Sequence, residues 1–162
     1  MTVSEIMQEM IVHANGNLHD IAHFVKVWAY AKTIGELEGL GEEPQFLLEA
    51  AAITHDIACP LCREKYGNTN GKYQELEGPV MVRAFLADTG MTEEQISRVA
   101  FLVGHHHTFH EIDGMDYQIL VEADYIANAA ESGYSRQNME NFMQKIMKTE
   151  SGKRILKAVF RI

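Results

Sequence analysis

Four side chains that could bind a metal ion occur in segments that are otherwise apolar. His23 lies on an apolar helical stripe, and the pair His55-Asp56 ends the most apolar stretch of the chain. Asp124 shares a helical face with Leu120. Burying a carboxylate without a partner is costly. Imidazole nitrogens and carboxylate oxygens suit Mn, Fe, Co, Ni or Zn, so one shared divalent ion would satisfy all four side chains.

Each feature also has an ordinary structural explanation. A His-Asp pair can reach solvent at the end of a helix, and a single histidine inside a helix is more often a core residue than a ligand. The metal hypothesis gains its strength from the combination, because convergence of three helices on one ion removes the burial cost of every member.

The segments that must position these residues have helical apolar spacing almost throughout. The patterns Thr2-x-x-Glu5 and Thr92-x-x-Gln95 are typical of capping boxes, and Pro60 is expected to end a helix. No alternating run of β-branched residues competes, so the predicted fold class is all-α, a compact multi-helix bundle. The predicted helices cover residues 4–13, 19–38, 44–58, 73–88, 92 into the histidine run at 105, 117–131, 135–149 and 151–160.

Composition excludes several classes of protein. The chain has 162 residues, 46% of them hydrophobic, and a formal net charge of -9. Such an acidic chain is a poor general binder of nucleic acid, although a metal ion would still allow a small phosphorylated ligand. We find no apolar stretch near the ~20 residues that span a bilayer. Residues 1–10 lack the features of a signal peptide, so we expect a soluble cytoplasmic protein without membrane association.

The four candidate ligands carry a family resemblance. The order of a single histidine, a His-Asp pair and a distant aspartate resembles the HD superfamily of metal-dependent phosphohydrolases. His23 opens the sequence H-F-V-K-V, similar to the family's H-x-x-[RK]-V, and 32 residues separate it from His55. A further 68 residues separate Asp56 from Asp124, and the resemblance covers roughly residues 18–131. It implies that the four residues hold a divalent transition metal, as one or two ions.

The resemblance also implies a domain organisation. We expect a single HD domain over residues 1–162, with a motif-bearing core at about 18–131 and C-terminal helices at 135–162. Oligomeric state is open between monomer and homodimer.

A histidine run precedes Thr108 and supplies further candidate ligands. His105, His106 and His107 could be a solvated helix end. Successive helical residues lie ~100° apart, so at most two of the three can face one site. Some HD subfamilies use extra histidines here to hold a second metal, and we favour His106 and His107 for that role.

This chain departs from the dinuclear pattern in one segment. Dinuclear members usually supply another histidine in the helix corresponding to residues 74–78, where this chain has none. Glu75 or Glu77 could bind the ion instead, or only one ion is held tightly. Solvated surface is the more common role for a glutamate on such a helix.

The resemblance implies hydrolysis of a nucleotide or another small phosphate ester by a metal-activated water. Asp56 is the expected catalytic residue, because it could both bind the ion and orient the water. Lys26 and Lys65 are candidate phosphate-binding residues, or simply solvated cations. Two thiols, Cys59 and Cys62, lack the context of a redox or zinc motif.

Three alternatives stay open. Some HD proteins resemble this chain in their ligands but hold two irons and activate oxygen, so a di-iron oxygenase is one alternative. A non-catalytic module that binds metal or nucleotide is the second. The third, a helical interaction domain, does not explain why the four polar residues lie in apolar segments.

Overall fold

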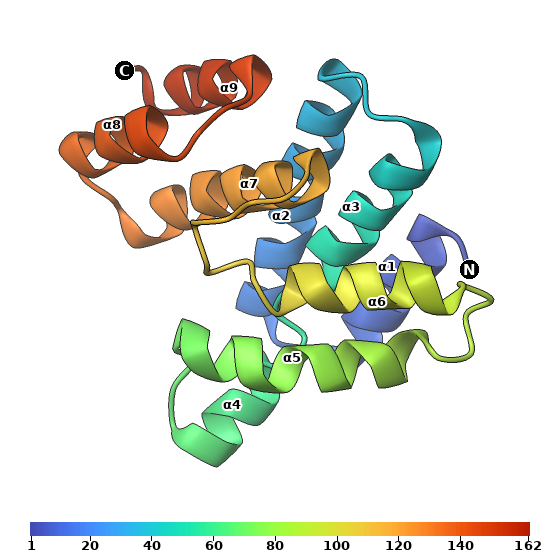
Figure 1. Cartoon of the computed structure of the whole chain (residues 1–162). Helices are drawn as coiled ribbons and strands as arrows, with labels where there is room; N and C mark the ends of the chain where they lie inside the picture. Colours follow the sequence, from blue (N-terminus) through green and yellow to red (C-terminus); the bar gives the residue numbers. More distant parts are fainter.

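The computed structural model describes all 162 residues, and every regular element in it is an α-helix. The prediction of an all-α fold is confirmed. No helix combines the length and the apolar character that crossing a membrane requires. The nine helices, shown in Figure 1, are α1 (Val3–His13), α2 (Leu18–Leu37), α3 (Glu42–Thr54), α4 (Cys59–Tyr66), α5 (Gly71–Leu86), α6 (Glu93–Val103), α7 (Met115–Ser132), α8 (Arg136–Lys145) and α9 (Glu150–Phe160).

Both predicted capping boxes are confirmed. The Thr2 hydroxyl accepts a hydrogen bond from the backbone N–H of Glu5, and the Glu5 carboxylate accepts one from the backbone N–H of Thr2. Thr92 and Gln95 exchange the same pair of bonds at the start of α6. These bonds satisfy N–H groups that a helix leaves free at its first turn, so the sequence determines where both helices begin.

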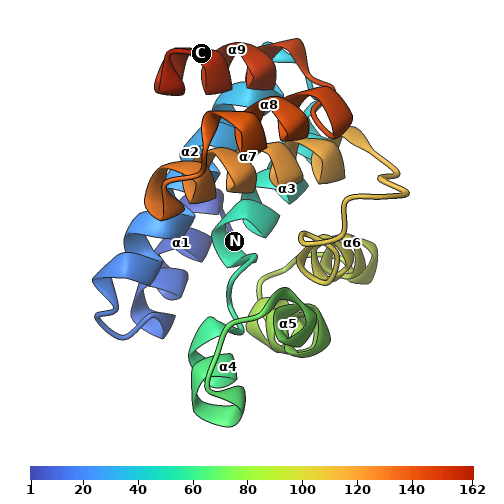
Figure 2. The same ribbon diagram turned by 90° about the vertical axis from the view of Figure 1, so that its left-hand side faces the viewer.

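The centre of the molecule is formed by α2, α3 and α7, which pack against one another. α1 and α6 each pack on α3, and α5 packs on α6. Figures 1 and 2 show α8 and α9 beyond α7, on the side opposite α4 and α5. The buried hydrophobic residues form one continuous core. Its largest fully buried side chains include Phe24, Ile34, Leu48, Ile53, Leu102, Tyr117, Leu120 and Ile126.

The predicted helix over residues 44–58 is wrong at its C-terminal end. α3 ends at Thr54, His55 is its C-cap residue, and Asp56 lies in the turn that follows. Pro60 begins a helix rather than ending one, because it stands in the first turn of α4, where its missing N–H is not needed. The turn aims the His-Asp pair toward α2 and α7 instead of leaving both residues on a helix.

The ends of two other predicted helices also differ. α6 ends at Val103, so the histidine run lies in a turn instead of continuing the helix. α8 ends at Lys145 rather than at Thr149. The backbone N–H groups of Lys148 and Thr149 donate to the buried carboxylate of Glu122 instead of continuing the helix. A side chain distant in sequence therefore ends α8, which local patterns do not indicate.

Candidate metal centre

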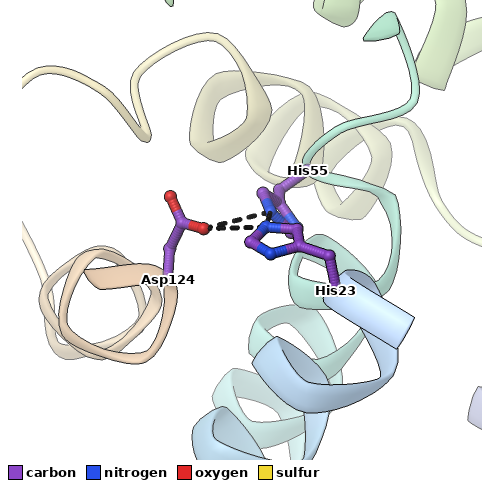
Figure 3. A group of neighbouring side chains, drawn as sticks. All are labelled: His23, His55 and Asp124. Atoms are coloured by element: carbon purple, nitrogen blue, oxygen red, sulfur yellow. Dashed lines mark hydrogen bonds and ion pairs between the residues drawn. The ribbon is translucent and has the colours of Figure 1, made fainter. Parts of the chain in front are cut away.

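Three buried side chains from three helical segments meet at one point. The Nε2 atoms of His23 and His55 are 3.1 Å apart, and Oδ1 of Asp124 lies 3.1 Å from the first and 3.3 Å from the second. Figure 3 shows the two rings and the carboxylate pointing toward one another. His23 comes from α2, His55 from the C-cap of α3 and Asp124 from α7. This is a group of ligand atoms that could hold one metal ion.

Asp56 connects this group to the histidine run. Its Oδ2 atom lies 3.3 Å from Nε2 of His23 and 3.4 Å from Nε2 of His55. Its other oxygen, Oδ1, lies 3.4 Å from Nε2 of His106. The Asp56 side chain is 21% exposed, whereas the histidines around it are buried, so Asp56 is the carboxylate of the cluster most open to an incoming molecule.

Hydrogen bonds at the opposite ring nitrogens fix how the three histidines can act. Nδ1 of His23 donates to Oε2 of Glu131 at 2.8 Å. Nδ1 of His55 and Nδ1 of His106 each donate over 2.7 Å to the backbone carbonyl oxygen three residues earlier. In the neutral rings the proton is therefore on Nδ1, and the lone pair on Nε2 faces the carboxylates of Asp56 and Asp124. Such outer hydrogen bonds orient histidines that bind metals.

The cluster consequently gathers acceptors that face other acceptors. Without extra protons or a cation, lone pairs on three imidazoles and two carboxylates would repel one another in a buried space. A divalent cation relieves this repulsion, because every facing atom becomes a ligand. The donor set, nitrogen with carboxylate oxygen, fits a transition metal.

The pKa shifts of these side chains also show that the cluster favours positive charge. Burial favours neutral His55, but attraction to Asp56 and Asp124 outweighs it and raises the pKa of His55 well above its ordinary value. The pKa of His23 is also raised, since its hydrogen bond to Asp124 and the nearby carboxylates outweigh burial. Burial alone would raise the pKa of both aspartates, but the charge of His55 and hydrogen bonds from the histidines hold them below their usual range.

The histidine run divides between the cluster and the surface. Nε2 of His106 and Nε2 of His107 lie 3.2 and 3.1 Å from Oε1 of Gln74. The same two histidines form a second group of candidate ligands with Asp124. His105 turns away and stacks on Phe101, so two of the three histidines face the cluster. Burial and the adjacent His106 lower the pKa of His107 to about 4, which keeps its ring neutral.

The two glutamates considered from the sequence are engaged elsewhere. Glu75 accepts hydrogen bonds from the backbone N–H of His107 and the hydroxyl of Thr108. Glu77 accepts from Lys65 and from the hydroxyl of Tyr66. Neither belongs to a group that could hold an ion, and Gln74 instead presents its amide oxygen to the histidines.

A polar cavity of about 140 Å³ opens beside the cluster. Arg63 lines it and is held by Asp20 through two hydrogen bonds of 2.7 and 2.6 Å. Lys65 pairs with Glu77 and does not line the cavity. Lys26 is also outside the lining, and its Nζ atom lies 2.6 Å from Oε1 of Glu131. Of the nearby cations, Arg63 is the one that faces the cluster's cavity.

Cys59 lines the same cavity but is poorly suited to covalent chemistry. It is buried, and burial together with the negative charge of Asp56 raises the pKa of its thiol. A thiol with a raised pKa stays protonated and is a weak nucleophile. Cys62 is also a free, buried thiol.

Sequence reasoning missed two polar residues of this site, Glu131 and Gln74, and it favoured Lys65 over the neighbouring Arg63, which lines the cavity. A signal existed for Glu131, which follows Asp124 by seven residues and therefore shares its face of α7. Gln74 reaches the site only through the packing of α5 on α6, and no local pattern marks it.

Known proteins resemble this chain in sequence and in fold. The HD domain family model matches residues 18–157. No curated protein matches the chain. Among solved structures, the chain is similar to a predicted HD superfamily hydrolase from an uncultured Thermotogales bacterium, with 17% identity and a TM-score of 0.68. That similarity covers 98% of this chain and 83% of the other, and at this identity it shows a shared fold. Because the family model spans most of its residues, the chain belongs to the HD domain family.

Proposed function

We propose that this protein is a metal-dependent phosphohydrolase that acts on a nucleotide or another small phosphate ester. Membership of the HD domain family supports a metal-dependent hydrolase, and the similar solved structure is itself named a hydrolase. The observation that carries the proposal is the set of Nε2 lone pairs that face two carboxylates while each Nδ1 atom is bound elsewhere. A divalent cation at this point would turn each of these facing atoms into a ligand.

The proposed ligands of the ion are His23, His55, Asp56 and Asp124. The mixture of nitrogen and carboxylate donors suits Mn, Fe, Co, Ni or Zn. His106 and His107 are the candidate ligands of a second ion, since they form a group with Asp124. Gln74 would contribute a neutral oxygen to that second position, which favours tighter binding at the first.

The chemistry follows from the position of Asp56. When bound, the ion polarises a phosphoryl oxygen and lowers the pKa of a coordinated water toward ~7. Asp56 is partly exposed, and its low pKa suits it to orient a water by accepting a hydrogen bond rather than to retain the proton. In the overall reaction the water oxygen bonds to phosphorus, the ester P–O bond breaks, and the alcohol leaves with a proton.

The polar cavity is the proposed position of the phosphoryl group. Its volume of about 140 Å³ suits a small anion, and Arg63 supplies a cation at its wall. Lys26 has an indirect role, because it contacts the carboxylate that orients His23. Lys65, which pairs with Glu77, is a weaker candidate than Arg63 for binding phosphate.

We also propose that residues 1–162 form one HD domain. Ile6 and Met10 precede the matched range, yet they belong to the same continuous core as Leu156 near its end. The first helix and the last helix would therefore fold together with the segment that carries the ligands.

Elemental analysis of untagged protein tests the metal first. We expect about one divalent ion per chain, lost in Asp124→Asn and retained in Glu77→Gln, whose carboxylate lies outside the cluster. Phosphate release from a panel of nucleotides and sugar phosphates then tests the reaction. A protein that takes up none of Mn, Fe, Co, Ni or Zn would refute the proposal. Two irons with oxygen uptake and no phosphate release would favour the oxygenase.

A further inference from the structure

A second cavity joins the candidate metal centre and has a different character. It measures about 410 Å³, whereas the polar cavity measures about 140 Å³. His107, Asp124 and Asn128 line both. The two cavities therefore meet at the cluster of candidate ligands, and a molecule held over this cluster can extend into the larger cavity. We name the larger cavity the aromatic cavity.

Two helices build the aromatic cavity with matching faces. Each supplies four residues at positions i, i+3, i+4 and i+7, which lie on one side of a helix. The residues from α7 are Val121, Asp124, Tyr125 and Asn128, and those from α8 are Asn138, Asn141, Phe142 and Lys145. Figure 2 shows α8 beside α7, and residues from both helices line the cavity.

Aromatic rings dominate the apolar part of these walls. The rings of Tyr125 and Phe142 stack with centroids 3.6 Å apart, and Phe109 meets Phe142 edge-on at 5.6 Å. Tyr134 lies 5.5 Å from Tyr125. Phe109 and Tyr134 remain 42% and 37% exposed, so their rings are available to pack against a further flat group.

The polar part of the walls offers amides and a single cation. The structure contains no hydrogen bond or ion pair from the side chains of Asn128 and Lys145. Asn138 and Asn141 use their Oδ1 atoms to accept from Tyr125 and Gln137, which leaves their N–H groups free to donate. Amides at an aromatic wall suit a ring that carries hydrogen-bonding groups, and one lysine is too little positive charge for several phosphates.

We propose that the aromatic cavity binds the leaving group of the substrate, and that this group carries a planar aromatic ring with hydrogen-bonding substituents, as a nucleobase does. This assignment rests on the proposed function, because it assumes that the phosphoryl group lies over the cluster of candidate metal ligands. Tyr134 and Phe109 stack on the ring, while the side-chain amides of Asn128 and Asn141 form hydrogen bonds with its polar edge. A monophosphate ester fits one phosphoryl site beside one ring-binding cavity better than a polyphosphate does.

Binding to the metal-free protein tests the cavity without catalysis. Calorimetry with adenosine and cytidine is expected to give binding, and ribose none. Tyr134→Ala and Asn141→Ala should each weaken binding by about tenfold, the scale of one lost stacking contact or one lost hydrogen bond. Gln144→Ala, on the same helix but outside the cavity, should bind as the parent protein does. Binding of ribose equal to that of the nucleosides, or no loss in either cavity variant, would overturn the proposal.

Hydrolysis supplies the second readout and separates the two hypotheses. For nucleoside monophosphates, kcat/KM should fall about tenfold in Tyr134→Ala and Asn141→Ala, while glycerol phosphate is hydrolysed as before. Equal losses on both kinds of ester would overturn the assignment of the cavity but preserve the phosphohydrolase. If no ester is hydrolysed by metal-loaded protein while nucleosides bind as expected, the proposed function fails and the ring-binding site stands.

Discussion

Nδ1 of His23 donates a hydrogen bond to Oε2 of Glu131 over 2.8 Å, and this bond joins two residues 108 positions apart. Nζ of Lys26 contacts the other oxygen of the same carboxylate at 2.6 Å. Glu131 therefore fixes both the tautomer and the orientation of His23 from the C-terminal turn of α7. The contact makes the end of α7 part of the candidate metal centre, although Glu131 belongs to none of the groups of candidate ligands.

Removing this carboxylate should weaken metal binding without removing a ligand. In Glu131→Ala we expect the affinity for Zn or Mn to fall about 10–100-fold, because His23 loses the partner that holds its Nε2 atom toward the cluster. Competition with a fluorescent chelator measures the affinity. Glu140→Ala is the matched control, since Glu140 pairs only with Arg136 on the surface of α8. Equal affinity in the Glu131 variant and the control would contradict the positioning role.

Removing the carboxylate of Asp56 should affect turnover more than it affects folding. Asp56→Ala is expected to lower kcat by at least about 100-fold and to weaken metal binding, because it deletes both a ligand and the acceptor that orients water. Asp113→Ala removes a carboxylate that pairs with Arg98 outside the cluster, and it should keep its activity. Phosphate release under metal-saturating conditions is the measurement, and a fully active Asp56 variant would remove the basis of the assignment.

The pKa shifts in the cluster predict how pH affects the metal-free protein. Raised pKa values of His23 and His55 stabilise the fold fully below about pH 6.5, and that stabilisation is lost as pH rises through the raised values. Lowered pKa values of Asp56 and Asp124 stabilise it above about pH 4, and that stabilisation is lost as pH falls through the lowered values. The cluster therefore favours the metal-free fold most between about pH 4 and about pH 6.5.

Thermal unfolding of metal-free protein checks this expectation. The Tm should be lower at about pH 8 than at about pH 6, and added metal should raise it more at the higher pH, since the ion replaces protons on the histidines. His23→Gln should reduce the pH dependence, while His110→Gln, an exposed histidine outside the cluster, should preserve it. The same pH dependence in both variants would show that the cluster is not its source.

Local sequence patterns predicted the helices well because the determinants of a helix lie close together. Thr2 and Glu5 are three residues apart, and the bonds between them fix the start of α1. The C-terminal boundary of α8 could not be predicted in this way. Its end depends on Glu122, which lies 26 residues before Lys148 and becomes its partner only in the folded chain.

The candidate ligands could be predicted because polar groups are conspicuous in apolar segments. His23, His55 and Asp124 stood out in the sequence, and the structure brings their ligand atoms within 3.3 Å of one another. Gln74 could not be found in this way. It is one polar residue on a mixed helix, and it gains its position only when α5 packs on α6 and presents its amide to the histidine run.

A second buried carboxylate, Glu122, has a structural role that measurement can separate from the metal centre. It is fully buried on α7 and accepts hydrogen bonds from Gln118, from the backbone of Lys148, and from the backbone and hydroxyl of Thr149. Its oxygens thus bind the segment between α8 and α9 to α7. None of its hydrogen-bond partners is a candidate metal ligand.

Replacing Glu122 should therefore destabilise the fold without removing a candidate metal ligand. Glu122→Ala leaves several buried donors without an acceptor, and we expect the free energy of unfolding to fall by about 3 kcal/mol. Urea unfolding of metal-free protein, with circular dichroism as the signal, measures the change. Glu64→Ala, an exposed position on α4, should change the free energy of unfolding by less than about 0.5 kcal/mol. A Glu122 variant as stable as the Glu64 variant would show that the carboxylate does not hold the C-terminal helices in place.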